Sequence, residues 1–338
     1  MAPSQLTPVT VLTGFLGSGK TTLLAALVAD ARFRDTAIIV NELGEASIDH
    51  LLLSQASGDV VELAGGCICC RAAGDIVRAL RDLHHKRSSG SAPAFRRVVI
   101  ETTGLADPAP LLATLIELPV TAARYALSGV VATVDSGEGM ATLDRHPESV
   151  KQVAVADRIV VTKTDRGPTS PGLLERLASL APGARILTAA RGAVDGALLF
   201  DAGLSRGATS PPDARGWLNE GAYASHRPSG RHDPRISSFV WRHAEPLAWD
   251  DLETALETLR DTVGARILRM KGLVAVAGEA GPRAVHMVQH ALYPPARLAA
   301  WPDADRTTRL VFIVRDLEEG AIAQILDSFT REKRTEPE

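Results

Sequence analysis

A glycine-rich segment near the start of the chain has the residue types and spacing of a phosphate-binding loop. Its sequence fits the pattern G-x-x-x-x-G-K-[ST]. Glycines allow backbone with positive φ, which turns N–H groups toward phosphate oxygens. We expect the lysine to reach the β- and γ-phosphates and the threonine hydroxyl to hold Mg²⁺. The pattern therefore predicts a nucleotide site formed by Gly14, Gly17, Ser18, Gly19, Lys20, Thr21 and Thr22.

Two further segments carry acidic residues that can act on the same phosphates. Glu101-Thr102-Thr103-Gly104 directly follows a buried strand. A carboxylate there can hold Mg²⁺ through water, and a glycine N–H there can meet the γ-phosphate. Glu42 follows another buried strand, at 37–40, and is expected to face the phosphates as well. The predicted catalytic residues are Lys20, Glu42, Glu101 and Gly104, and the predicted Mg²⁺ ligands are Thr21 and Glu101.

The segment Thr162-Lys163-Thr164-Asp165 has groups suited to a guanine base. Asp165 can accept hydrogen bonds from N1–H and the exocyclic amine of guanine, and the stem of Lys163 can lie over the ring. Adenine lacks N1–H, so it would leave a buried carboxylate unpaired. The segment predicts a preference for GTP through Thr162, Lys163 and Asp165.

The cysteines form one short cluster, Cys67-Ile68-Cys69-Cys70. Thiolates at this spacing can converge on a soft or borderline cation such as Zn²⁺. A redox thiol cluster and three buried small residues are alternatives. Three thiols also fall short of a closed four-ligand zinc site, so the fourth ligand is left open: a side chain, water or a partner's group.

The elements that position these residues alternate between strands and helices. Apolar, β-branched runs predict strands, and helical spacing of apolar residues predicts helices between them. Nearly continuous apolar strands indicate a mostly parallel sheet covered by helices on both faces, with ligands beyond the carboxyl ends of the strands. Strands are predicted at 9–13, 37–40, 59–63, 98–100, 130–134, 159–161 and 185–188, and helices at 22–31, 73–87, 111–118 and 171–180.

The second part of the chain predicts a smaller α+β domain. Residues 203–235 are rich in Gly, Ser, Pro, Arg and His and show little periodicity, which is typical of a linker. We place the phosphate-loop domain at 1–202, the α+β domain at 236–330 and a polar tail at 331–338. The α+β domain is expected to start near 236–241. Within it, strands are expected at 285–292 and 310–314 and in a stretch at 267–276 broken at Lys271-Gly272, and helices at 252–259 and 319–329.

Composition limits the classes of partner. The chain has 338 residues, 45% of them hydrophobic and 23% charged, which is ordinary for a globular protein. A formal net charge of −3 gives no electrostatic basis for binding nucleic acid or an anionic membrane. No apolar run is long enough to span a bilayer, and the first eight residues lack signal-peptide features. We expect a cytoplasmic protein, in a reducing compartment that suits clustered free thiols.

The order of these motifs resembles the CobW-type metallochaperone GTPases. The resemblance extends over the first domain and includes the CxCC at Cys67, Cys69 and Cys70. Residues 267–272 and 288–295 resemble the C-terminal domain of that family. The resemblance implies slow GTP hydrolysis coupled to loading zinc, cobalt or another transition metal into a client metalloprotein, with the three cysteines as metal ligands.

Two features depart from the family pattern. Thr162 stands where the guanine motif usually has Asn, and a hydroxyl offers fewer hydrogen bonds than an amide. The region between the domains keeps only His226 and His232 of a stretch that is often His-rich, and we interpret both as exposed loop residues. The metal, the client and the oligomeric state are not specified by the sequence.

Two other functions fit parts of the pattern. A small-molecule kinase would use the phosphate loop for ATP, but Asp165 favours guanine. A non-catalytic thiol sensor or zinc buffer would use the nucleotide only for structure.

Overall fold

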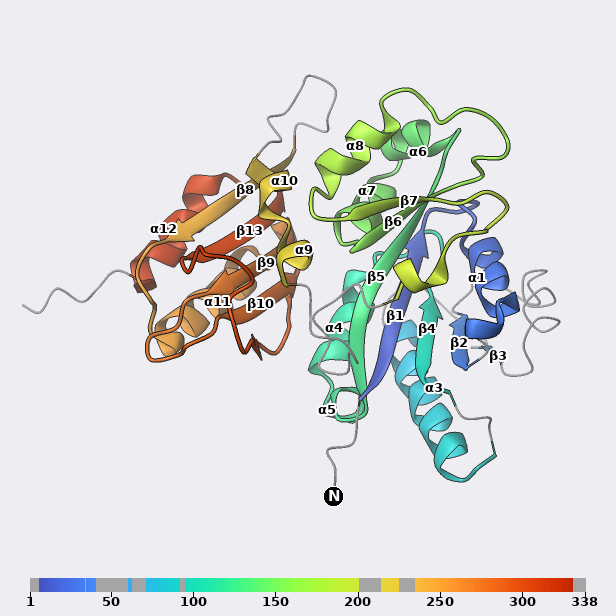
Figure 1. Cartoon of the computed structure of the whole chain (residues 1–338), viewed down its shortest axis with the longest axis horizontal. Helices are drawn as coiled ribbons and strands as arrows, with labels where there is room; N and C mark the ends of the chain where they lie inside the picture. The colour runs from blue at the N-terminus through green and yellow to red at the C-terminus, as the bar shows by residue number, and fades with distance from the viewer. Residues whose placement is uncertain are drawn as a thin grey trace, which may run out of the picture. The chain divides into compact units, whose positions relative to one another are not determined.

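The structure, a computed structural model, describes residues 6–33, 35–40, 60–62, 71–91, 95–200, 214–224 and 235–330. The chain folds into two compact units, Met1–Asp213 and Ala214–Glu338. Figure 1 labels the elements of both units.

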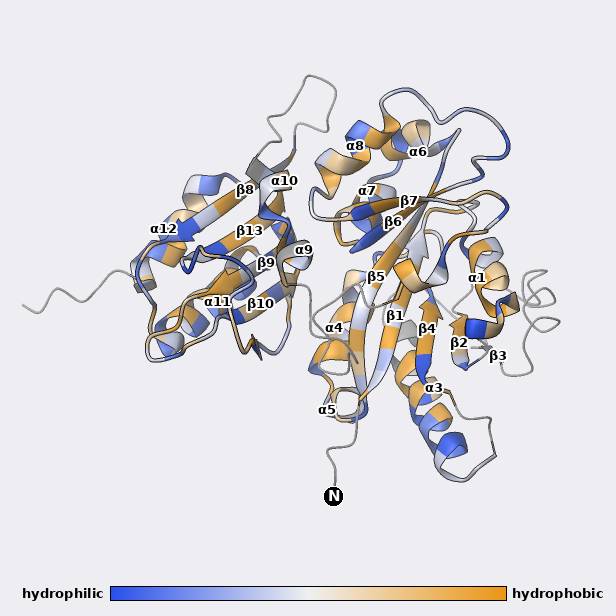
Figure 2. Ribbon diagram, in the orientation of Figure 1, coloured by the Kyte–Doolittle hydropathy of each residue, from blue (hydrophilic) through white to orange (hydrophobic). Residues whose placement is uncertain are grey.

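The first unit is built on a seven-stranded sheet with the order β3-β2-β4-β1-β5-β6-β7. Every neighbouring pair is parallel. Strands β1, β2, β4, β5 and β6 are mostly buried, because helices cover both faces of a parallel sheet, and this explains their nearly continuous apolar runs (Figure 2). The predicted parallel sheet is confirmed. The strands are β1 (Thr7–Gly14), β2 (Thr36–Val40), β3 (Val60–Glu62), β4 (Arg97–Glu101), β5 (Tyr125–Asp135), β6 (Arg158–Thr162) and β7 (Arg185–Thr188).

Helices flank this sheet. Leu23, Leu24 and Leu27 of the first helix pack with strand residues such as Val99 and Val131 in one apolar cluster. Among the described residues, none from a later helix belongs to that cluster, whereas α4 and α7 contact β5. No described helix combines the length and the apolar character needed to cross a membrane. The helices are α1 (Lys20–Ala29), α3 (Arg71–Ser88), α4 (Ala109–Glu117), α5 (Pro119–Ala122), α6 (Gly139–Arg145), α7 (Pro147–Ala154) and α8 (Leu173–Leu180).

The second unit is built on an antiparallel sheet in the order β11-β10-β9-β13-β8, with β12 paired to β10. Its core joins sheet residues such as Phe312 to Leu256, Leu259 and Leu326 of its two longer helices. The predicted α+β architecture is confirmed. The elements are α9 (Ala214–Leu218), α10 (Glu220–Ala224), β8 (Ile236–His243), α11 (Trp249–Val263), β9 (Ile267–Val274), β10 (Arg283–Val288), β11 (Ala291–Leu292), β12 (Ala296–Arg297), β13 (Thr308–Arg315) and α12 (Glu319–Thr330).

Three local expectations differ from the structure. The predicted break at Lys271-Gly272 is wrong: β9 runs through both residues because each pairs with β10 on one side and β13 on the other. The predicted strand at 285–292 is two strands, since Gln289 adopts a left-handed φ of 50° and turns the chain back. Within residues 203–235, where the sequence predicts a linker, the structure describes the short helices α9 and α10.

Candidate nucleotide site

The phosphate loop, residues 15–19, connects β1 to α1. Gly14 has a φ of 141°, and a Cβ on it would lie 2.3 Å from Thr133 Oγ1. Gly19, at the N-cap of α1, has a φ of 92°. Both positions therefore require glycine. The first turn of α1 contains no acidic residue and its N-cap makes no side-chain hydrogen bond, so its N–H groups and its dipole favour an anion at the loop.

The Lys20 side chain holds a buried positive charge at this loop. The residue is 8% exposed. Its Nζ donates to the carbonyl oxygens of Gly14, at 2.9 Å, and Phe15, at 3.2 Å. A buried ammonium needs such partners because desolvation without them is costly. The backbone carbonyls of the loop region thus hold the Lys20 ammonium beside the phosphate loop, the position expected from the motif.

Thr21 and Glu101 meet although they lie 80 residues apart. Thr21 Oγ1 donates to Glu101 Oε1 over 2.9 Å. Glu101 ends β4, which pairs with β1 so that Glu101 lies opposite Leu12, and the carboxylate side chain belongs to a residue only 1% exposed. A hydroxyl and a carboxylate side by side are the hard oxygen ligands that Mg²⁺ prefers. The two residues predicted as Mg²⁺ ligands are thus in contact.

The β4–α4 loop, residues 102–108, lies against the phosphate loop. Thr102 N donates to Leu12 O over 2.9 Å, and Thr102 Oγ1 donates to Thr13 Oγ1 over 3.0 Å. A Cβ on Gly104 would lie 2.6 Å from Leu16 N, so only glycine allows this approach. The predicted γ-phosphate contact, Gly104, is next to the loop that would hold the phosphates.

Two residues of α7 that the sequence analysis did not identify contact this loop. Gln152 Nε2 donates to Gly104 O, at 3.1 Å, and Ala106 O, at 3.0 Å. Lys151 Nζ forms an ion pair with Asp107 over 2.7 Å. Neither residue belongs to a motif. The start of α7 itself has a sequence signal: Pro147 is at the first helical position and the acidic Glu148 follows it, a pattern typical of a helix N-terminus.

Thr162 faces the phosphate loop and is 2% exposed. Its hydroxyl lies 2.6 Å from Ser18 O and 3.2 Å from Val134 O, and it donates to these carbonyls. Ser18 Oγ in turn lies 2.6 Å from Thr133 Oγ1. The hydroxyl in place of the usual amide thus joins the end of β6 to the loop after β1.

Lys163 follows with a left-handed φ of 57°. Its Nζ donates to Asp135 Oδ2 over 2.6 Å, at the end of β5. Burial raises the pKa of Asp135, but the hydrogen bond from Lys163 and those from the N–H groups of Glu138 and Gly137 outweigh it, so the net pKa lies below the ordinary value. The Asp135 carboxylate therefore stays charged and holds the Lys163 side chain in place.

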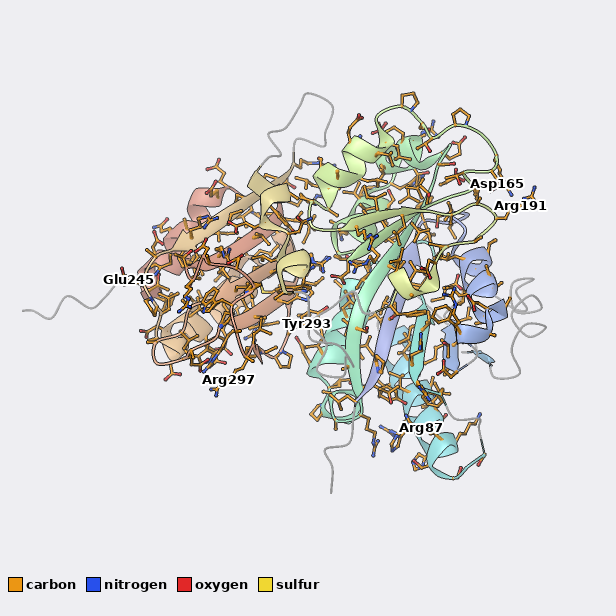
Figure 3. The ribbon with its side chains drawn as sticks, in the orientation of Figure 1. Arg87, Asp165, Arg191, Glu245, Tyr293 and Arg297 are labelled. Atoms are coloured by element: carbon orange, nitrogen blue, oxygen red, sulfur yellow. The ribbon has the colours of Figure 1, made fainter. Side chains whose placement is uncertain are left out.

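Asp165 is oriented from the loop after β7. Arg191 N donates to Asp165 Oδ1 over 2.8 Å, and the Arg191 side chain lies beside the same carboxylate (Figure 3). The backbone hydrogen bond from Arg191 lowers the pKa of Asp165. The lowered pKa keeps this carboxylate ionised at neutral pH. The Asp165 side chain is 26% exposed, so a guanine base could reach it.

A cavity of about 200 Å³ lies beside the phosphate loop. It is lined by residues 14–18 of that region, by the end of β5, and by α6 and α7. Gln152 and Lys163 border it, whereas Lys20 and Thr21 do not. The cavity is therefore separate from the Thr21–Glu101 contact.

Several predicted site residues lie outside the described part of the chain. Among the residues that the structure does describe, no group of three or more His, Cys, Asp or Glu could hold a metal ion. The metal-ligand prediction and the interpretation of the inter-domain histidines stay predictions. The residues outside the described ranges are Glu42, Cys67, Cys69, Cys70, His226 and His232.

Comparisons with known families match both units. Residues 8–188 match the family described as CobW/HypB/UreG, nucleotide-binding domain. Residues 236–330 match the family described as cobalamin synthesis protein cobW C-terminal domain. The two matches follow each other along the chain and include the phosphate loop, the Thr21–Glu101 contact and the guanine motif.

Relatives cover nearly the full length. The chain is 33% identical to the zinc chaperone YjiA of Escherichia coli, over 93% of this chain and 96% of that protein. It is 25% identical to the zinc-regulated GTPase metalloprotein activator 1 of Saccharomyces cerevisiae, over 94% and 82%. The crystal structure of the Zn(II)-bound YjiA GTPase from E. coli matches with a TM-score of 0.66 at 27% identity, over 96% of this chain and 99% of that chain.

Proposed function

The chain belongs to the CobW/HypB/UreG family of nucleotide-binding proteins, and we propose that this GTPase couples GTP hydrolysis to loading zinc into a client metalloprotein. The observation that carries the proposal is the hydrogen bond between Thr21 and Glu101. It joins the first turn of α1, directly after the phosphate loop, to an acidic strand end, and Mg²⁺-dependent phosphoryl transfer uses such a pair.

At the phosphate end, the chain's own groups bind and orient GTP. The N–H groups of residues 15–20 surround the phosphates, and Lys20 stabilises negative charge on the transferring phosphoryl group. Thr21 and Glu101 would hold Mg²⁺, which would supply positive charge to stabilise the phosphates during transfer. Gly104 N–H donates to the γ-phosphate, and Glu42 is the remaining catalytic residue of the proposal.

At the base end, selectivity comes from hydrogen bonds. Asp165 accepts from the guanine N1–H and amine, and Lys163, held by Asp135, lays its stem over the ring. Thr162 supports the phosphate loop through Ser18 O, so its replacement of Asn leaves the base contacts to Asp165.

The cargo is a thiophilic cation. Cys67, Cys69 and Cys70 are the proposed ligands, and Zn²⁺ is the proposed metal because relatives are named zinc chaperones. Co²⁺ suits the same thiolate set. The relative named a metalloprotein activator supports a client metalloprotein as the receiver. An incomplete set of protein ligands suits transfer to such a client.

The test is a titration of Zn²⁺ into the full chain with a non-hydrolysable GTP analogue, and again with GDP. Binding couplings are reciprocal and a useful switch requires about 5- to 150-fold. We expect tighter Zn²⁺ binding in one nucleotide state by that factor, rising with pH because thiols must lose protons.

Substitutions at the cysteines test which residues bind Zn²⁺. Cys67→Ala, Cys69→Ala and Cys70→Ala each should weaken Zn²⁺ binding, whereas the matched controls His226→Ala and His232→Ala should not. Equal Zn²⁺ affinity with the GTP analogue and with GDP would contradict coupling between nucleotide and metal, and would favour a zinc buffer. Unchanged affinity in all three cysteine variants places the metal elsewhere.

A further inference from the structure

Helix α7 contacts both segments that would face the phosphates. At its N-cap, the ring of His146 stacks on the Phe15 ring of the phosphate loop, with centroids 4.2 Å apart. Six residues further along, about 1.7 turns, Gln152 contacts the β4–α4 loop. A single rigid element thus spans two loops that come from different strands.

Gln152 makes the stronger contact with the β4–α4 loop. It is 1% exposed, and its amide donates to the carbonyls of both Gly104 and Ala106. Because peptide units are planar, holding two carbonyls in so short a segment fixes the backbone between them. A buried carbonyl that loses its donor bears a desolvation penalty, so this arrangement is costly to change.

The second contact is weaker. The Lys151–Asp107 ion pair has side chains that are 30% and 27% exposed. Partly exposed pairs contribute little to stability because solvent screens them. The buried amide of Gln152 is therefore the main restraint on the loop.

The loop has little freedom to shift without changing the site. Gly104 is already at contact distance from Leu16, because a Cβ would be 2.6 Å from Leu16 N. A small displacement of Gly104 toward or away from the phosphate loop would change the distance to any γ-phosphate bound there. Such misplacement costs rate steeply.

We propose that α7 sets the spacing between the phosphate loop and the β4–α4 loop, with Gln152 as the positioning residue for Gly104. The inference rests on the proposed contact between Gly104 N–H and the γ-phosphate. Gln152 is proposed to touch neither the nucleotide nor Mg²⁺. It acts through the backbone of Gly104 and Ala106.

The two nucleotide states separate positioning from general stability. GDP has no γ-phosphate, so a displaced Gly104 weakens binding of a non-hydrolysable GTP analogue and leaves GDP binding unchanged. A variant that only loosens the fold weakens both. The ratio of the two affinities is thus the deciding readout, together with the turnover number.

The experiment compares Gln152→Ala and Gln152→Met with Val150→Ala in the full chain. Val150 is on the same helix and 4% exposed, so its truncation costs packing without removing a hydrogen bond to the loop. Gln152→Met keeps the side-chain length but removes the amide donor. It is the variant to measure if Gln152→Ala fails to fold. We expect both Gln152 variants to lose turnover by about 10- to 100-fold, with a reduced analogue-to-GDP affinity ratio.

Unchanged turnover in a folded Gln152 variant overturns the proposal, and so does a ratio no lower than that of Val150→Ala. Glu101→Gln is measured in parallel to test the site itself. If Glu101→Gln loses hydrolysis while Gln152→Met keeps it, the GTP site stands and the positioning role falls. If neither variant loses hydrolysis, the proposed site falls as well.

Discussion

The phosphate end and the base end of the candidate site differ in burial. At the phosphate end, Lys20, Glu101 and Thr162 are each less than a tenth exposed. Lys20 donates to Gly14 O, Thr162 donates to Ser18 O, and Glu101 Oε1 accepts from Thr21. At the base end, the side chain of Asp165 is 26% exposed and its partner Arg191 is 88% exposed.

This difference separates two tasks. Every nucleoside triphosphate presents the same phosphates, so a fixed, buried and preorganised set of groups suits catalysis. The base differs between nucleotides, and the proposed role of Asp165 is to select guanine through hydrogen bonds that only its N1–H and exocyclic amine supply together. Substitutions at the phosphate end should therefore change the rate of GTP hydrolysis, and substitutions at the base end should change which nucleotide is bound.

The largest effect is expected for Lys20→Ala. Removing a preorganised positive charge from the transferring phosphoryl group should lower turnover by about 10²- to 10³-fold. Turnover of GTP is measured together with circular dichroism, which should report an intact fold. A folded variant with unchanged turnover would remove Lys20 from the mechanism.

Next in size are Glu101→Gln and Thr21→Ala, which remove the paired oxygen ligands. Each should lower turnover by about 10²-fold at a fixed Mg²⁺ concentration, and Thr21→Ala should require more Mg²⁺ for half-maximal rate. Turnover is measured across a Mg²⁺ titration. An unaltered Mg²⁺ dependence in both variants contradicts the assignment of these residues.

Asp165→Asn tests the base end alone. Its amide donates to the 2-oxo group of xanthine, so affinity should shift from GTP toward xanthosine triphosphate, by about 10- to 100-fold in the ratio. The turnover number at saturating nucleotide should change far less. A variant that keeps its GTP preference would place the base pocket elsewhere.

The smallest effect concerns the ion pair that holds Lys163. The pKa of Asp135 is lowered in the folded chain, so its contribution to stability is present above the ordinary Asp value of 3.8 and is lost as pH falls below it. Asp135→Asn should cost about 1 kcal/mol at neutral pH. Urea unfolding at several pH values measures this; a difference that persists at the lowest pH, or one absent at neutral pH, contradicts the ion pair's role.

The two ends also differ in what the sequence could predict. The phosphate end was predictable because glycines with positive φ, a lysine and a threonine have one common use at this spacing, and Glu101 follows a recognisable buried strand. The orientation of Thr162 was not predictable, since a hydroxyl beside a guanine motif can face the base or the loop. Only the packing of Gly19 and Ser18 against the end of β6 decides it.

Long-range tertiary contacts explain the other differences. Gln152 belongs to a helix of eight residues with no motif, and its role arises only when the fold brings α7 to the β4–α4 loop. In the second unit, Gly272 favours a strand break by propensity, but pairing on both sides keeps β9 continuous. The parallel sheet itself was predictable because strands buried on both faces have continuous apolar sequences.

The separation of the two ends is tested most directly by measuring GTP and ATP binding to the unmodified chain and to Lys20→Ala. We expect the unmodified chain to prefer GTP, and Lys20→Ala to bind both nucleotides more weakly with the same GTP-to-ATP affinity ratio. Equal affinity of the unmodified chain for ATP and GTP would contradict separate phosphate and base ends, as would a GTP-to-ATP ratio that falls to one when only Lys20 is changed.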